Sequence, residues 1–453
     1  MRVAGLSILS LFLLLGLTPW AHTQELESRS AAVTSQDDGY DATHMLTRVV
    51  ELVREQYVDQ SKVSYEELYQ AAAKGVLSSL DPHSQFLDED AFSAMQKDTS
   101  GEFSGLGLMV GAKDRAIVVL SAMEGTPSHR AGILPGDRIL KIDGVSTEDM
   151  SLNEAVKHMK GENGESIRLT LLRRNDAGEG TVIEPIMQRE TIRVATVRAA
   201  KILPEEMTGK TRIGYVRLEQ FGEHTEEEFA DALGKLEAEG MEALVLDLRN
   251  NPGGLLDSAV EVAGKFLPTG QVIVSTKGRS SRNSYEYTAA STQRAGDYPL
   301  AVLVNAYSAS GAEIVAGALQ DLDRAVLVGE TTFGKGSVQS VQSLGEGIGL
   351  RLTTAHYYTP SKKVIHEVGV SPDISVPIGR EEEEKLQLAT RPHLLDDEQK
   401  EQVRNLRDTQ LERAVVALKG INLWAGREQL RNKPEATRQQ AANQSLPAPA
   451  REQ

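Results

Sequence analysis

The strongest constraint on the fold of this 453-residue chain is the alternation of strand-like and helix-like segments between residues 185 and 375. The apolar runs "IGYVRLEQF" and "ALVLDLRNN" flank the helical pattern "TEEEFADALGKLEAEG", and "LAVLVN" precedes the helical pattern "SGAEIVAGALQDL". Strands that alternate with helices along a chain form a largely parallel sheet covered by helices. We therefore predict an α/β core over residues 176–379.

A different pattern occupies residues 98–175, where short β-rich runs are separated by glycines. The runs are "GLGLMVG", "AIVVLSA", "GDRILKIDG" and "ESIRLTLLRR", and two short helical stretches, "SHRAGI" and "SLNEAVKHMKG", lie between them. In "HRAGILPGDRILKIDGV" a short helix leads to a turn at residues 135–137, then to a strand and a second turn at residues 143–144. This pattern predicts a small β domain inserted before the α/β core.

Helical segments are predicted on both sides of these two domains. Residues 44–97 begin with apolar side chains at helical spacing, and the capping-box sequence "SYEE" opens a second helix. The apolar positions of the two helices are Leu46, Val49, Val50, Val53 and Tyr57, followed by Leu68, Ala72 and Val76. A segment of about 50 residues is too small to bury a core of its own. We therefore expect it to pack on another domain or on a second subunit.

The C-terminal part is predicted to be helical over residues 380–425 and disordered over residues 426–453. Leu411, Val415 and Leu418 share one helical stripe, and the glycine two residues further on marks a predicted helix end. The last residues are rich in Pro, Gln and Ala, a composition that buries little apolar surface. The acidic run "REEEEK" is interpreted as a solvated face rather than a binding site.

The charge balance and the N-terminus restrict the class of protein. The formal net charge of -16 argues against a nucleic-acid partner, because phosphate binding needs clustered Lys and Arg. Residues 1–23 contain an apolar run of about 15 residues, the length of a signal-peptide core and short for a membrane span. We interpret them as a signal peptide, followed by a polar linker over residues 24–43. The alternative, an uncleaved N-terminal anchor, would be the one contact with a membrane.

The absence of cysteine restricts the chemistry and the compartment. A chain without Cys has no disulfide, no thiolate nucleophile and no thiolate metal site. We expect neither a metal nor a cofactor. An exported, Cys-free chain with a short signal is typical of a bacterial periplasmic protein.

Two loops that follow predicted strands of the α/β core carry candidate catalytic groups. In "DLRNNPGGLL", Gly253 and Gly254 leave backbone N–H groups uncovered, as an oxyanion hole requires. In "NAYSASGAE", Ser310 lies at a strand-to-helix turn with the amide of Gly311 beside it. Loops at the carboxyl ends of strands line the site in an open α/β sheet, so a nucleophile with oxyanion donors is predicted here. The alternative is that Ser308 or Ser310 only caps the helix.

A serine hydroxyl needs a base, and "GKGSVQSV" supplies a candidate in Lys335. Gly334 and Gly336 flank this lysine and allow close backbone packing, and the resulting desolvation favours the neutral amine. If the following residues form a strand, Lys335 and Gln339 share one face. Gln339 can then orient the amine without adding a negative charge.

Three alternatives to this base remain at the level of the sequence. In the first, Lys335 is an exposed loop lysine. In the second, His356 or His366 on a later strand is the base, which spacing alone leaves open. In the third, "GETTFGK" belongs to a nucleotide-binding loop, but Gly336 stands where such a loop needs Ser or Thr, and a strand-like run follows where a helix is required.

The small β domain resembles a PDZ domain. Gly105, Leu106, Gly107 and Leu108 in "FSGLGL" match the loop whose N–H groups bind the C-terminal carboxylate of a peptide, which then adds as a strand to the sheet edge. Glycines suit such a loop because side chains would keep the carboxylate away from the amides. The alternative is a tight turn that binds no ligand.

Several motifs together resemble the carboxyl-terminal processing (tail-specific) peptidases: "DLRNNPGG", "SASGAE", "GETTFGKGSVQ", "HEVGVSPDI" and "LDPHSQFL". The similarity spans about residues 40–376 and implies a serine endopeptidase. The residues that match the family's site are Ser310 (nucleophile), Lys335 (base), Gln339 (orienting residue) and Gly253, Gly254 and Gly311 (oxyanion donors). Family members often carry Ala or Ser where Gly311 stands, a change that keeps the amide.

The resemblance also implies how such a protein works. Protein substrates are recruited by their C-terminal tails through the PDZ domain. A further hypothesis is a protease of low basal activity that tail binding or an adaptor switches on. The terminal helical segments resemble those that family members use for self-association, so a homo-oligomer is expected. A PDZ scaffold that binds tails without cleaving them is the alternative function.

Overall fold

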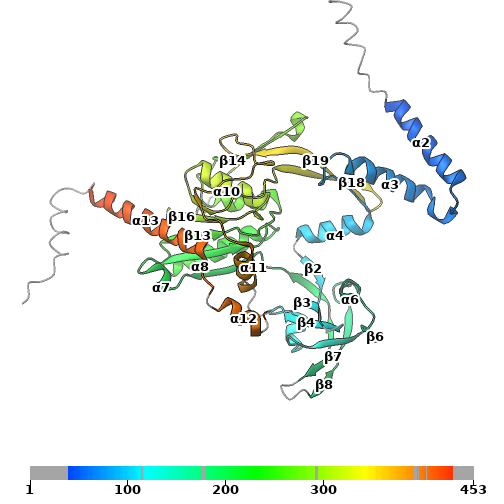
Figure 1. Ribbon diagram of the computed structural model, residues 1–453, viewed down its shortest axis with the longest axis horizontal. Coiled ribbons are helices and arrows are strands. Elements are labelled where there is room, and N and C mark those ends of the chain that lie inside the picture. Colours follow the sequence, from blue (N-terminus) through cyan, green and yellow to red (C-terminus); the bar gives the residue numbers. More distant parts are fainter. Residues whose placement is uncertain are drawn as a thin grey trace, which may run out of the picture. The chain divides into compact units, whose positions relative to one another are not determined.

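The computed structural model describes residues 39–100, 102–113, 116–174, 179–290, 294–390, 395, 397–404 and 406–431 (Figure 1). The chain divides into two compact units, Met1–Leu80 and Asp81–Gln453. The predicted signal peptide lies outside the described residues, as do the linker up to residue 38 and the tail from residue 432. No described helix is long and apolar enough to cross a membrane.

The first unit contains two helices, α2 (Gly39–Gln56) and α3 (Tyr65–Ser78), with a short 3-10 helix, η1 (Gln60–Lys62), between them. Helix α2 begins inside the predicted linker, five residues before residue 44. The predicted capping box at the start of α3 is confirmed. The Glu67 N–H donates to Ser64 Oγ at 3.2 Å, and the Ser64 N–H donates to the Glu67 carboxylate at 3.4 Å.

The burial pattern of these two helices differs in part from the prediction. Val50 is buried as expected, but Val76 is 59% exposed and Leu77 is buried in its place. One residue corresponds to about 100° around a helix, so the buried stripe of α3 is rotated by one position. The apolar side chains that stay exposed on the N-terminal part of this unit are Tyr40, Met45, Leu46, Val49, Leu52, Tyr57 and Val58.

The small β domain is built on an antiparallel sheet with the strand order β3-β4-β5-β7-β8, to which β6 and β9 add beside β5 and β7. Its strands are β3 (Leu108–Lys113), β4 (Ala116–Ala122), β5 (Arg138–Ile142), β6 (Val145–Ser146), β7 (Ser166–Arg174), β8 (Gly180–Ile183) and β9 (Ile186–Gln188). Strand β3 is the first strand of this order, so it forms an edge of the sheet.

Two short helices, α5 (Pro127–Arg130) and α6 (Leu152–Met159), lie at the predicted positions in this domain. Ala155 of α6 packs in one buried cluster with Ile139 and Leu169 of the sheet. The predicted turn before β6 has φ 49° at Asp143 and φ 84° at Gly144, the left-handed pair of a tight two-residue hairpin turn.

The small β domain extends further than predicted. We expected it to end at residue 175, but β8 and β9 both pair with β7. A separate pair of strands, β2 (Glu102–Gly105) and β10 (Glu190–Arg193), joins the two ends of the domain, with Glu102 opposite Arg193. The boundary was missed because strand pairing across a loop leaves no local pattern in the sequence.

The second unit also contains the predicted α/β core. Its main sheet has the order β11-β12-β13-β16-β17-β20; β11 is antiparallel to β12 and the other neighbours are parallel. The largely parallel sheet is therefore confirmed. Its strands are β11 (Val197–Ile202), β12 (Ile213–Leu218), β13 (Ala243–Asp247), β16 (Leu300–Val304), β17 (Val326–Gly329) and β20 (Ile374–Ser375).

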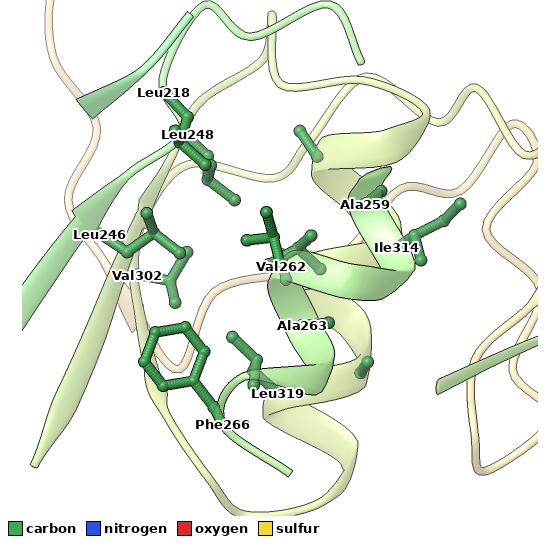
Figure 2. Close-up of a cluster of buried hydrophobic side chains, with 14 of the residues drawn as sticks. Leu218, Leu246, Leu248, Ala259, Val262, Ala263, Phe266, Val302, Ile314 and Leu319 are labelled. Atoms are coloured by element: carbon green, nitrogen blue, oxygen red, sulfur yellow. The ribbon is translucent and has the colours of Figure 1, made fainter. Parts of the chain in front are cut away.

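Helices cover both faces of this sheet. On one face, α8 (Thr225–Ala238), α9 (Leu256–Gly264) and α10 (Gly311–Asp321) enclose a large buried cluster. Figure 2 shows its centre, where Leu246 and Val302 from the strands face Val262 and Leu319 from the helices. On the other face, Val415 of α13 (Thr409–Arg431) belongs to a second buried cluster with strand residues of β13 and β16.

The C-terminal helices are α11 (Arg380–Ala389), α12 (Asp397–Val403) and α13. The predicted stripe on α13 is confirmed, since Val415 and Leu418 are buried and Leu411 packs against their cluster. Two other predictions were wrong, because the helix passes through Gly420 and continues to Arg431, into the segment predicted to be disordered. A single glycine costs a helix only about 1 kcal/mol, which the packing of the preceding turns offsets.

A second core sheet is antiparallel, with the order β1-β19-β14-β15 and β18 paired with β19. This antiparallel sheet was not predicted. Its strands are β1 (Gln85–Leu87), β14 (Val272–Gly278), β15 (Glu286–Thr288), β18 (Ser337–Gly345) and β19 (Ile348–Tyr358). The remaining elements of the second unit are α4 (Glu89–Ser100), α7 (Glu205–Thr208) and η2 (Ser281–Asn283).

Candidate active site

Ser310 lies between the end of β16 and the start of α10, at the predicted strand-to-helix turn. Its backbone has φ 53° and ψ -111°, a conformation that a non-glycine residue keeps only where its surroundings hold it. The Ser310 N–H donates to Oε2 of Glu313 at 2.8 Å, and the Glu313 N–H donates to the Ser310 carbonyl oxygen at 2.9 Å. The start of α10 therefore has a capping-box arrangement, in which the Glu313 carboxylate binds the N–H group of Ser310.

The neighbouring Ser308 has a structural role. It is fully buried, its Oγ donates to the Leu248 carbonyl at 2.8 Å, and it accepts from the Asn305 N–H at 3.0 Å. One residue later, the Ala309 N–H donates to the Asn251 carbonyl at 2.9 Å. These bonds attach residues 305–313, which we call the nucleophile turn, to the loop after β13.

The Gly253-Gly254 loop contacts the nucleophile turn. A Cβ atom at Gly253 would lie 2.7 Å from Cβ of Ser310, and a Cβ atom at Gly254 would overlap the carbonyl group of Phe221. The Gly253 N–H donates to the side-chain oxygen of Asn251 at 2.8 Å. In this conformation that N–H is therefore occupied, so Gly253 does not have the free amide that its predicted donor role requires.

Gly311 begins α10 directly after Ser310. A Cβ atom on Gly311 would lie 3.1 Å from the Phe221 ring and 3.3 Å from Cβ of Ala259. These distances are tighter than ordinary contacts, so Phe221 and Ala259 leave little room for the Ala or Ser that is often found here in the resembled family.

Lys335 lies in a loop immediately before β18, within residues 334–339, which we call the base segment. A Cβ atom on Gly336 would overlap the backbone nitrogen of His366, and one on Gly334 would lie 3.1 Å from that of Val368. Both glycines thus permit a close backbone approach, as predicted. This packing fixes the position of the Lys335 backbone, from which the side chain extends.

The surroundings of Lys335 favour its neutral form. Burial lowers the pKa of the Lys335 amine, the charge of Arg351 lowers it further, and the charge of Glu313 opposes both effects. Arg351 is held by its own hydrogen bonds, from Nε to the His83 carbonyl at 3.1 Å and from a terminal nitrogen to the Gln85 side chain at 2.8 Å. A base that takes a proton from serine must be neutral, so this direction suits the predicted role.

Gln339 lies on β18 but does not meet Lys335 as predicted. The strand starts at Ser337, and a bulge lies between Val338 and Gln339, so the expected strand alternation from residue 335 is wrong. The Gln339 amide donates to Ser337 Oγ at 2.8 Å and lies 3.5 Å from Thr353 Oγ1. Across the described part of the chain, no hydrogen bond joins the Lys335 amine to Gln339 or to the Ser310 hydroxyl.

Glu313 is the site residue that the sequence reasoning missed. It is fully buried on α10, and its carboxylate accepts hydrogen bonds from both candidate loops. Oε1 accepts from Thr332 Oγ1 at 2.5 Å and from the Gly334 N–H at 2.7 Å, and Oε2 accepts from the N–H groups of Ser310 at 2.8 Å and Lys335 at 2.9 Å. A glutamate among the small apolar residues of "SGAEIVAGAL" was the available signal.

Three histidines lie around the base segment. Burial lowers the pKa of His83, and the charge of Lys335 lowers it further. The His356 and His366 rings are 4.5 Å apart, and the buried Nδ1 atom of each has no hydrogen-bond partner among the described residues. No group of three or more His, Cys, Asp or Glu residues in the described ranges has the geometry of a metal site.

A buried ion network holds the loop that carries the glycine pair. Burial alone would raise the pKa of Asp247, but the charges of Arg249 and Arg217 lower it to about 2. Arg249 also pairs with Asp408 at 2.7 Å and bonds to Gln410 at 3.1 Å. The start of α13 is therefore tied to the "DLRNNPGG" loop.

The predicted peptide-binding loop connects β2 and β3. Gly105 ends β2, Leu106 and Gly107 form the connection, and Leu108 begins the edge strand β3. Gly107 has φ 72°, and a Cβ atom there would overlap the Thr126 side chain. The Leu106 side chain belongs to the domain core, being 3% exposed, so this loop offers a ligand its main chain and not that side chain.

Family models match both domains. A model of peptidase family S41 matches residues 212–376, and a model of the PDZ domain matches residues 118–173. The first match contains the nucleophile turn and the base segment, and the second contains most of the small antiparallel sheet.

Known proteins match over most of their length. A carboxy-terminal-processing protease of Bartonella bacilliformis is 40% identical over 353 residues, which is 77% of this chain and 78% of the relative. The carboxy-terminal processing protease CtpA of Bacillus subtilis is 36% identical over 330 residues, 73% of this chain and 68% of the relative. A solved photosystem II D1 C-terminal processing protease is 29% identical, covers 73% of this chain and 92% of its own, and has a TM-score of 0.43.

Proposed function

Because this chain belongs to the carboxyl-terminal processing proteases of peptidase family S41, a family of serine peptidases with a PDZ domain, we propose that Ser310 and Lys335 form its catalytic dyad. One observation carries this proposal. The N–H groups of Ser310 and Lys335 donate to the same oxygen of one buried carboxylate, which brings the main chains of the two residues together. The lowered pKa of the Lys335 amine increases the fraction of the base that is neutral at a given pH.

The proposed reaction proceeds through an acyl-enzyme. The neutral Lys335 amine accepts the hydroxyl proton of Ser310 while Oγ bonds to the scissile carbonyl carbon. The carbonyl electron pair moves to the oxygen, where the N–H groups of Gly254 and Gly311 donate to it. As the tetrahedral intermediate collapses, the C–N bond breaks and the Lys335 ammonium returns its proton to the leaving amine. Water then repeats these steps on the ester.

The resting geometry supports a protease that is switched on. The Lys335 amine must approach the Ser310 hydroxyl, and Gln339 must exchange its bond with Ser337 for one with the amine. Catalytic hydrogen bonds are often long or absent before substrate binds. We propose that binding of a tail or of an adaptor favours this rearrangement. A PDZ scaffold that binds without cleaving would keep the resting geometry.

The proposed substrates are periplasmic proteins with accessible C-terminal tails. The N–H groups of the loop at residues 105–108 would receive the tail carboxylate, and the tail would add as a strand to the open edge of β3. The exposed apolar side chains of α2 suit a homo-oligomer through the terminal helices, because patches of this kind mark protein contacts. The periplasmic location rests on the N-terminal signal pattern and the absence of Cys.

The test uses an unstructured model protein with an apolar C-terminal tail, prepared with a free carboxylate and with a carboxamide. Wild type should cleave the carboxylate form faster, and Ser310→Ala should cleave neither form. Removing residues 103–192 should abolish the preference for the carboxylate and leave the core folded, because Glu102 and Arg193 already lie opposite each other. Equal cleavage by wild type and Ser310→Ala would overturn the catalytic proposal, and an unchanged preference after the deletion would overturn the recruitment proposal.

A further inference from the structure

The carboxylate of Glu313 occupies an unusual position between the two halves of the proposed dyad. It lies on α10, one turn after Ser310, and is fully buried. One oxygen is shared by the N–H groups of Ser310 and Lys335, and the other by Gly334 and Thr332. The nucleophile turn and the base segment are therefore both hydrogen-bonded to the Glu313 carboxylate.

We infer that Glu313 is a positioning residue that sets the separation of the nucleophile and the base and also the charge felt by the base. The inference rests on the proposed Ser310–Lys335 dyad and adds a third residue to it. Glu313 touches neither the substrate nor the reacting atoms, so it acts through the main chains of the other two residues.

The hydrogen bonds require a carboxylate and not merely a polar side chain. All four partners of Glu313 donate, three through backbone N–H groups and one through a hydroxyl. A glutamine in this place would offer one acceptor oxygen, and its NH2 group would face either the N–H groups of Ser310 and Lys335 or the Gly334 N–H and the Thr332 hydroxyl. In both orientations at least one backbone N–H group would lose its buried acceptor, which shifts one loop away from the other.

The charge of Glu313 has a second effect that a packing role would not have. It raises the pKa of the Lys335 amine, against the effects of burial and of Arg351. Removing the charge should therefore lower the pKa of Lys335. The two roles predict opposite changes, because loss of positioning lowers turnover while loss of charge increases the neutral fraction of the base at low pH.

The strain at Ser310 gives the carboxylate a third function. A residue with φ 53° and ψ -111° relaxes unless the surrounding bonds oppose it. The Glu313 side chain binds the Ser310 N–H, and the Glu313 N–H binds the Ser310 carbonyl, so the same residue holds the strained peptide from both sides. A small displacement at this point separates the hydroxyl from the base and reduces turnover strongly.

The experiment compares Glu313→Gln and Glu313→Asp with wild type and with Gln320→Ala. Gln320 lies on the same helix, and its side chain bonds to Ser371 and Asp373 at a distance from the dyad, so it serves as the matched control. The measurements are kcat, KM and the pH dependence of kcat/KM on a tailed substrate, together with the thermal unfolding midpoint. Ser310→Ala is measured in parallel.

For Glu313→Gln we expect kcat to fall about a hundredfold with little change in KM, because the geometry and not the substrate contacts is lost. The acid limb of its pH profile should move to lower pH. Glu313→Asp keeps the charge but shortens the side chain, so kcat should fall while the acid limb stays at the wild-type position. Gln320→Ala should match wild type in kcat, KM and the pH dependence of kcat/KM.

Distinct outcomes overturn the inference and the dyad. If Ser310→Ala is inactive but Glu313→Gln keeps at least half of the wild-type kcat, Glu313 is not a positioning residue and the dyad stands. If kcat falls in Glu313→Gln with an unmoved acid limb and a lowered unfolding midpoint, the role is structural only. If Glu313→Gln does not fold, Glu313→Asp decides, since wild-type kcat in that variant overturns the inference. Activity in Ser310→Ala overturns the dyad itself.

Discussion

The nucleophile turn and the base segment share one carboxylate but differ in how their side chains are held. In the nucleophile turn, the buried Ser308 hydroxyl bonds to Leu248 and Asn305, and the main chain of Ser310 is bonded on both sides. In the base segment the main chain is fixed as well. The N–H groups of Tyr357 and Glu367 donate to the carbonyls of Gly336 and Gly334 at 2.7 and 2.8 Å. The Lys335 amine, in contrast, makes no hydrogen bond within the described residues.

In the proposed mechanism, this difference assigns activation to the side chains of the base segment. Hydrogen bonds hold the backbone of both loops, so the proposed switch rotates side chains and does not refold the loops. Rotations of this kind are fast and change few contacts, which suits a switch that a bound tail or adaptor operates. The largest effect is expected when the Lys335 amine is removed. Smaller effects are expected when the backbone around Lys335, the residue that orients its amine, or the neighbouring positive charge is changed.

Replacing Lys335 by Met should have the largest effect. The variant keeps a side chain of similar size and apolar stem but has no amine to accept the Ser310 proton. We expect kcat/KM to fall about a thousandfold or more, as is typical when a general base that acts with a nucleophile is lost. In wild type the rate should rise with pH and level off above the lowered pKa of Lys335. Steady-state cleavage of a tailed substrate between pH 6 and 10 measures both effects.

The same variant should be more stable than wild type at neutral pH. The folded state lowers the pKa of Lys335, so the unfolded chain binds more protons and the buried ammonium destabilises wild type below that lowered pKa. This cost disappears as the pH rises toward the ordinary pKa of lysine. The thermal unfolding midpoint of Lys335→Met should therefore exceed that of wild type at pH 7 and converge with it in alkaline buffer. A lower midpoint at pH 7 would mean that the ammonium is well solvated.

Replacing Gly336 by Ala should disturb the backbone of the base segment. The added Cβ would overlap the backbone of His366, which cannot move aside as a flexible side chain can. We expect a loss of about 1–3 kcal/mol in unfolding free energy from overpacking. Displacement of Lys335 by as little as an ångström should lower turnover about a hundredfold. Denaturant unfolding and steady-state kinetics test the two parts separately.

The matched control is Gly234→Ala. Gly234 lies in the interior of α8, and a Cβ atom there would meet nothing within 4 Å. This variant should gain about 0.5–1 kcal/mol of unfolding free energy, since alanine is the better helix former. Its turnover should equal that of wild type. Equal behaviour of the two glycine variants would show that the contact with His366 does not constrain the base.

The two loops also differ in how far the sequence predicted them. The nucleophile turn was predicted because local signals coincide there: a buried strand ends at Val304, an apolar-periodic helix begins at Gly311, and Ser310 lies between them. The parallel sheet was predicted for the same reason. A continuous apolar run flanked by turn residues needs no knowledge of distant contacts to be recognised as a buried strand.

The base segment was predicted in chemistry but not in geometry. Lys335 precedes the strand, and the bulge before Gln339 turns that side chain toward Ser337, because the loop is fixed by backbone contacts with a segment about 30 residues further along the chain. The antiparallel sheet has the same origin, since β1 pairs with β19 across more than 260 residues. Contacts of this kind leave no periodic pattern in the sequence.

Replacing Gln339 by Ala should have a moderate effect. If Gln339 leaves Ser337 to orient the Lys335 amine during catalysis, the variant loses one hydrogen bond in the transition state. Such a bond contributes about 1 kcal/mol, which corresponds to a fall in kcat of roughly fivefold to tenfold with little change in KM. Gln342→Ala on the exposed part of β18 is the control and should behave as wild type. An unchanged kcat in Gln339→Ala would leave this side chain with its resting bond to Ser337 as its only role.

Replacing Arg351 by Met should have the smallest effect on rate and the clearest effect on pH dependence. Arg351 lowers the pKa of Lys335, so removing its charge should raise that pKa and move the acid limb of kcat/KM to higher pH. The maximal rate at high pH should stay close to that of wild type, because the base is neutral there in both proteins. At pH 7 the variant should be slower by a few-fold at most.

Two controls separate the charge of Arg351 from its hydrogen bonds. Arg351→Lys keeps the positive charge and should leave the acid limb near its wild-type position. Gln85→Ala removes the partner of one guanidinium nitrogen but keeps the charge, so it should do the same. If all three variants shift the limb equally, the hydrogen bonds of Arg351 to His83 and Gln85, and not its charge, determine the pKa of the base. If only Arg351→Met shifts the acid limb, the charge of Arg351 sets the pKa of the base. The reactivity of the base segment would then depend on electrostatics, whereas that of the nucleophile turn depends on its hydrogen-bonded geometry.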